Sequence, residues 1–172
     1  MRRFVSTLVV IVFVSLTGAA VAQDATSGAT ATCNFDGDKQ LAAGYQHVAI
    51  NLNKPLLGHE IPSGKVWAPG GKPMTLFTNT PVVVGGKQLA VGAYTMFVIP
   101  AAKQWTLIIS RDLDISGKYY ETMDLVRVPM ESGELPAPES QFSVSFAHVA
   151  PDQCSLRLEV ATIGTYVVFQ RK

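Results

Sequence analysis

The sequence is poor in charged residues, cysteine and histidine. Only 16% of its 172 residues are charged, and it holds two cysteines and three histidines. With a formal net charge of +1 and no basic run, it offers no electrostatic surface for nucleic acid, so we expect no nucleic-acid partner. Neither cysteine has a second one at zinc-ligand spacing, and we predict no metal and no cofactor.

A helical pattern is also missing. After the N-terminal segment, no stretch of ten or more residues repeats apolar positions at helical spacing between a cap and a stop. Short runs separated by glycine and proline occur instead, and residues 142–146 and 156–160 alternate between apolar and polar. This pattern predicts an all-β fold, a single antiparallel β-sandwich of about nine strands with jelly-roll or immunoglobulin-like topology.

Residues 82–110 carry the densest strand signals. The apolar run 82–84 stops at Gly85-Gly86, which can take the positive φ angles that a two-residue hairpin turn requires. Further strands are expected at 94–99 and 105–109, joined by a turn at 100–103.

The N-terminus predicts export. Arg2 and Arg3 precede an apolar stretch at 4–16, and Ala20-Val21-Ala22 fits a signal-peptidase site. We therefore expect a signal peptide at 1–22, a flexible or irregular lead at 23–46 and the sandwich domain at 47–172. The mature protein would be periplasmic or secreted, without a membrane span. An uncleaved membrane anchor is the alternative.

Cys33 and Cys154 form an even pair in a chain that is expected to leave the cytoplasm. An oxidising compartment favours a disulfide between them, and two separate thiols are the alternative.

Several motifs carry a family resemblance. They are the Pro-Ser-Gly-Lys-Val-Trp segment at 62–67, the Gly-Gly-Lys hairpin at 85–89, and the strands at 90–100, 104–106 and 124–128. Together they resemble the bacterial family called domain of unknown function 2911, over most of residues 47–172. The resemblance implies an exported β-sandwich protein and assigns no activity.

The chain departs from that family pattern directly after Trp67. The family usually shows Arg-Thr-Gly-Ala-Asn-Glu there, a polar set suited to a binding site. Residues 68–73 read Ala-Pro-Gly-Gly-Lys-Pro. The departure implies that any family site built from those groups is lost or rebuilt here.

A small metal-assisted hydrolase is the alternative to a non-catalytic function. His59 and Glu60 could share an ion with His148, since imidazole and carboxylate suit zinc. The spacing matches no ligand motif, however. His148 also shares the inward parity of residues 142–146, which favours a hydrogen-bonded histidine at a strand end.

Four carboxylates gather in one connection, at Asp112, Asp114, Glu121 and Asp124. They could form an acid–base pair or a calcium site. The glycine and distal glutamate of a calcium loop are missing, so a solvated loop is favoured.

The better-motivated site is aromatic. Trp67 lies in a proline- and glycine-rich connection, where Lys65, His59 and Lys72 could complete a binding patch for a glycan or a peptide. Trp105 is expected instead to pack in the core against Tyr94. We predict an exported binding or envelope-associated module without catalytic residues. A purely structural domain is a third hypothesis, and the oligomeric state stays open.

Overall fold

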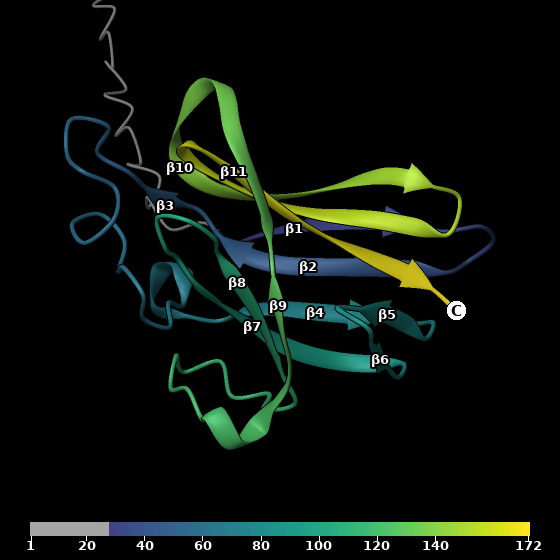
Figure 1. The fold of residues 1–172 in the computed structure, drawn as a ribbon. Helices are drawn as coiled ribbons and strands as arrows, with labels where there is room; N and C mark the ends of the chain where they lie inside the picture. The colour runs from purple at the N-terminus through teal and green to yellow at the C-terminus, as the bar shows by residue number, and fades with distance from the viewer. Residues whose placement is uncertain (1–27) are drawn as a thin grey trace, which may run out of the picture.

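The computed structural model describes residues 28–172, which form two antiparallel sheets packed face to face (Figure 1). The six-stranded sheet has the order β1-β2-β4-β7-β8-β9, and the five-stranded sheet has the order β3-β10-β11-β5-β6. The predicted β-sandwich is confirmed, with eleven strands in these residues where about nine were expected. No α-helix occurs among them, and none of their helical segments is long and apolar enough to cross a bilayer.

The strands of the six-stranded sheet are β1 (Gly28–Asn34), β2 (Gln40–Gln46), β4 (Met74–Thr78), β7 (Gly92–Ile99), β8 (Thr106–Ser110) and β9 (Asp124–Pro129). Those of the other sheet are β3 (Val48–Ala49), β5 (Val82–Val84), β6 (Lys87–Leu89), β10 (Glu131–Ala150) and β11 (Gln153–Arg171). Two short 3₁₀ helices, Pro69–Gly71 and Glu121–Met123, lie in connections.

The hairpin predicted at Gly85-Gly86 is present. Val84 pairs with Lys87 across the turn, and the two glycines have φ angles of 54° and 74°. Positive φ at both central positions is the type I′ geometry, whose twist matches that of the flanking strands.

The lead predicted at 23–46 is wrong from residue 28 onwards, because β1 and β2 are paired strands of the sheet. Their side chains are mostly small, so the apolar alternation is weak in the sequence, although Leu41 and Ala43 are fully buried. The sandwich therefore includes residues 28–46. Residues 23–27 and the predicted signal peptide lie outside the described residues.

The predicted disulfide between Cys33 and Cys154 is confirmed. Cys33 lies on β1 and Cys154 on β11, so the bond joins the two sheets covalently. Both residues are buried. Between the sheets lies one core of apolar side chains, whose largest fully buried members include Trp105, Phe142, Phe169, Leu41, Met74 and Leu107.

Residues 131–140 hold a glycine and two prolines, which are typical of a surface connection, but the segment belongs to β10. Its pairing with β11 shifts register between Glu134 and Glu139, and Ala161 on β11 has a φ of 49°. Prolines at 136 and 138 cannot donate ladder hydrogen bonds, which fits a bulge at this point. Bulges bend strands, and β11 turns sharply partway along its length (Figure 1).

Candidate functional site

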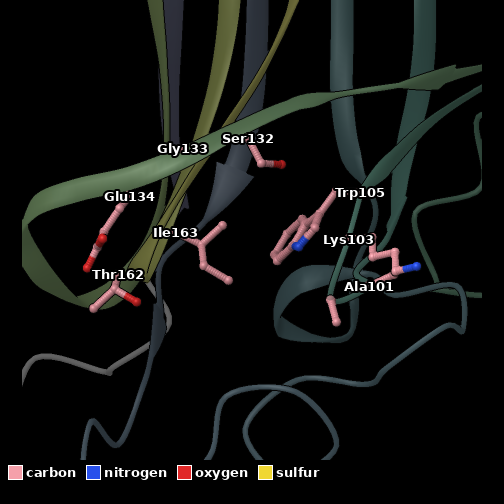
Figure 2. A pocket seen from close by; sticks show the side chains of 9 residues that line it. Ala101, Lys103, Trp105, Ser132, Gly133, Glu134, Thr162 and Ile163 are labelled. Carbon is pink, nitrogen blue, oxygen red and sulfur yellow. The ribbon is translucent and has the colours of Figure 1, made fainter.

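A cavity of about 340 Å³ lies between the β7–β8 connection and the bulged part of β10 and β11 (Figure 2). The β7–β8 connection follows β7 through Pro100, and β10 begins directly after β9. The bulge bends β10 and β11, and polar residues of both strands line the cavity opposite this connection. The lining residues are Ala101, Ala102, Lys103, Trp105, Ser132, Gly133, Glu134, Thr162 and Ile163.

Trp105 is the buried member of this set, with 1% of its surface exposed. Its carbonyl oxygen accepts a hydrogen bond from the Met130 N–H at 2.8 Å, and its ring meets Trp67 edge to face with centroids 6.5 Å apart. These contacts fix the position of the indole.

The indole Nε1–H of Trp105 has no hydrogen-bond partner within residues 28–172. A buried donor without a partner costs about 1–3 kcal/mol relative to a satisfied one. Trp105 also lines the cavity, so a ligand whose hydrogen-bond acceptor reaches this atom would relieve the cost.

The rim of the cavity is polar and carries two opposite charges. Ser132 and Thr162 contribute hydroxyl groups, and Lys103 and Glu134 contribute an ammonium and a carboxylate. Figure 2 shows Lys103 and Glu134 on opposite sides of the Trp105 indole. Neither charge belongs to any ion pair among the described residues.

The bulge shapes this rim. Ala161, directly before Thr162, has a left-handed backbone that a residue with a Cβ rarely adopts, and such strain is concentrated at functional sites. Before the bulge, the inward-facing residues of β11 have even numbers, as at Leu158 and Val160. After it they have odd numbers, as at Ile163 and Thr165. The exposed Thr162 lies at the junction.

The predicted patch around Trp67 is not gathered at this cavity. Trp67 is half-buried, its ring meets Phe142 at a centroid distance of 5.2 Å, and its backbone exchanges two hydrogen bonds with Val98. His59 and Lys65 are exposed. A site formed by these residues and Lys72 stays a prediction.

Lys72 itself lines a separate cavity of about 300 Å³ over β1, β2 and β4. The expected burial of Trp105 is confirmed, but its contact with Tyr94 is not found. The aromatic neighbour of Trp105 is Trp67, and the Tyr94 hydroxyl donates to the carbonyl oxygen of Ala90.

The residues of the alternative hydrolase do not assemble. Among the described residues, the one group of three potential ligand side chains close enough to share an ion is Cys33, His148 and Cys154. It contains neither His59 nor Glu60, and its two sulfurs are joined in the disulfide.

His148 keeps the predicted inward parity, because it pairs with the buried Cys154 and its imidazole lies within 4.8 Å of the Cys33 and Cys154 sulfurs, although the residue itself is exposed. The register shift between His148 and Ala150 follows this residue, so His148 is the last position of the regular pairing with β11. Glu60 accepts a hydrogen bond from the Asn51 N–H at 2.9 Å. This contact ties the carboxylate into its own loop.

The four carboxylates of the acidic connection divide between two structural tasks. Asp112 accepts from the N–H of Asp114, and Asp114 accepts from the N–H of Ser116, so both organise local turns. Glu121 and Asp124 both pair with Arg127, at 3.0 and 2.8 Å. The four do not form a shared ion site among the described residues.

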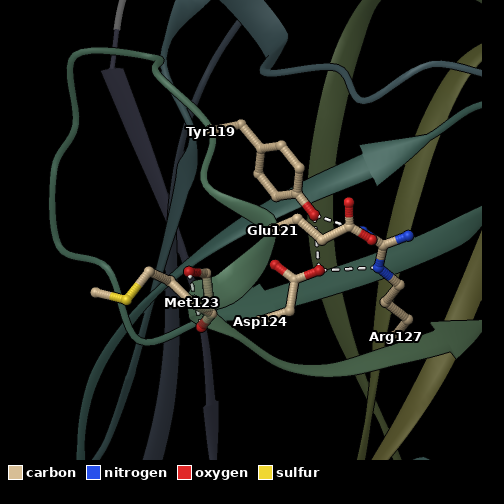
Figure 3. Close-up of polar contacts among 6 residues, drawn as sticks. Tyr119, Glu121, Met123, Asp124 and Arg127 are labelled. Atoms are coloured by element: carbon tan, nitrogen blue, oxygen red, sulfur yellow. Dashed lines mark hydrogen bonds and ion pairs between the residues drawn. The ribbon is translucent and has the colours of Figure 1, made fainter.

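Tyr119 joins the second of these groups (Figure 3). Its hydroxyl donates to Asp124 at 2.7 Å and accepts from Arg127 at 2.6 Å. Burial, followed by the hydrogen bond to Asp124, raises the pKa of Tyr119 to about 12. The ring packs edge to face on Phe97, so the network holds the connection against the outer face of the six-stranded sheet.

The comparisons with known proteins agree with the motifs in the sequence. The family model of a protein of unknown function, DUF2911, matches residues 27–168. The chain belongs to this family. The match includes β1 and β2, which lie outside the range of the resemblance in the sequence. No curated protein and no solved structure matches this DUF2911 member.

Proposed function

We propose that this DUF2911 protein is an exported, non-catalytic binding module that holds a small polar ligand in the cavity beside Trp105. The observation that carries the proposal is that Trp105, a buried residue that lines the cavity, has an indole Nε1–H without a partner within residues 28–172. A cavity of about 340 Å³ is within the size range of small-molecule sites, and a few polar groups on an apolar floor are typical of them.

The chemistry of the lining supports binding over catalysis. Ser132 and Thr162 are the hydroxyl groups of the cavity, and the basic side chains that form hydrogen bonds within residues 28–172, Arg127 and Arg171, bond to neither of them. Activation of a hydroxyl nucleophile needs such a base within hydrogen-bond reach. Glycans and short peptides both offer acceptors to an indole N–H, so either class fits at this level.

Export is supported by the disulfide between the sheets, since such bonds persist in oxidising compartments. Cell fractionation and N-terminal sequencing test it. We expect the protein in the exported fraction with Gln23 as its first residue. A cytoplasmic protein with an intact N-terminus would contradict this part of the proposal.

A ligand screen tests the binding site. The protein from the exported fraction is screened against peptides and oligosaccharides by thermal shift, because ligands that bind the native state raise the melting temperature. The dissociation constant of each hit is then measured by calorimetry for the wild type, Trp105→Phe and the control Tyr120→Phe.

Trp105→Phe keeps an aromatic ring and removes the N–H donor. One hydrogen bond contributes about 0.5–1.5 kcal/mol, so we expect the dissociation constant to rise about three- to ten-fold. Tyr120→Phe should change it little, because Tyr120 is exposed and is not among the residues that line the cavity. An unchanged dissociation constant in Trp105→Phe would refute the proposed site.

A further inference from the structure

We infer that the ligand is a zwitterion of the amino-acid or short-peptide class, with its carboxylate at Lys103 and its ammonium group at Glu134. This inference rests on the proposed function and names the ligand class of the same cavity. It starts from the two charges on the rim.

Lys103 and Glu134 are both exposed, both line the cavity, and neither is paired with another charge in residues 28–172. They lie on opposite sides of the indole (Figure 2). A ligand with one charge would meet an attractive group on one side and a repulsive group on the other. A ligand with both charges meets two attractive groups, and complementarity of this kind sets specificity.

The groups between the charges suit a peptide backbone. The Trp105 Nε1–H is a donor without a partner, which matches a peptide carbonyl oxygen. The hydroxyls of Ser132 and Thr162 can donate or accept, so they match either a carbonyl or an N–H. A neutral sugar could use the hydroxyls and the indole, but it would leave both charges unused.

Three probes separate these ligands by calorimetry on the protein from the exported fraction. Trialanine is zwitterionic, N-acetyl-trialanine amide has the same backbone without end charges, and maltotriose is a neutral sugar. Exposed ion pairs contribute about 0.2–1 kcal/mol, so each end charge should strengthen binding up to about five-fold. We expect trialanine to bind most tightly, and its advantage over the neutral peptide to shrink at high salt.

Side-chain variants then assign each charge to its partner. Lys103→Gln should weaken trialanine and leave C-terminally amidated trialanine unchanged. Glu134→Gln should weaken trialanine and leave N-acetylated trialanine unchanged. The matched controls Lys87→Gln and Glu139→Gln alter exposed residues outside the cavity lining and should change neither.

Two results would overturn the inference and leave the proposed function standing. One is equal binding of trialanine and its neutral derivative, with both losing affinity in Trp105→Phe. The other is binding of maltotriose alone, again dependent on Trp105. The absence of binding for all three probes would also count against a peptide ligand. By contrast, ligands whose binding ignores Trp105→Phe would refute the proposed function itself.

Discussion

Replacing Cys33 and Cys154 together by alanine should strongly destabilise the fold. The bond links residues 121 positions apart and ties β1, an edge strand of one sheet, to β11 in the other. In the chain-entropy model, a crosslink that closes a loop of roughly 100 residues contributes about 4.7 kcal/mol to the free energy of unfolding. For a domain of this size, that corresponds to a melting temperature lower by roughly 10–20 °C.

Urea denaturation followed by tryptophan fluorescence, with and without a dithiol reductant, measures this loss. We expect the reductant to lower the wild-type midpoint to that of the double variant and to leave the variant unchanged. Ser155→Ala is the control, since it removes a buried hydroxyl without a partner in residues 28–172 and should be nearly neutral. Equal midpoints for wild type and variant, insensitive to reductant, would refute the reasoning.

Two further predictions concern the connection between β8 and β9. Gly117→Ala should destabilise the fold by roughly 2–3 kcal/mol, because φ at Gly117 is 90° and a Cβ would lie 2.2 Å from the Gly71 carbonyl oxygen. Gly86→Ala, also at positive φ but in open space, should cost less, and equal losses in urea midpoint would contradict the account.

Tyr119→Phe tests pH dependence. With its pKa raised from 10.0 to about 12, neutral Tyr119 stabilises the fold fully below pH 10, and this stabilisation is lost as pH rises through 12. The difference in free energy of unfolding between wild type and Tyr119→Phe should therefore shrink over that range, and a constant difference would contradict it.

The strands that the sequence predicts best are those with apolar alternation and glycine turns between them. β5, β6 and the hairpin at Gly85-Gly86 follow from local chemistry alone, and β7 and β8 from dense β-branched and aromatic runs. β1 and β2 were missed because their alternation is carried by alanine, threonine and glycine. Such strands are held by backbone pairing, β1 by the disulfide as well, and neither signal is local.

The candidate site could not be predicted, because it depends on long-range packing. Trp105 was correctly predicted to be buried, but the missing partner of its Nε1–H is visible only when its neighbours are known. Ser132 and Glu134 lie in a segment whose prolines indicate a surface loop, while the structure bends it as a bulged strand. The sequence does contain one signal for the site, the polar run Glu-Ser-Gly-Glu at 131–134, which follows the strand at 124–129.

The central claim is that a ligand bonds to the Trp105 indole, and two-dimensional proton–nitrogen NMR tests it most directly. The chain has two tryptophans, so the spectrum holds two indole N–H signals, which Trp67→Phe assigns. We predict that titration with trialanine moves the Trp105 signal downfield and slows its exchange with water, while the Trp67 signal moves less. Binding that leaves the Trp105 signal in place would contradict the account.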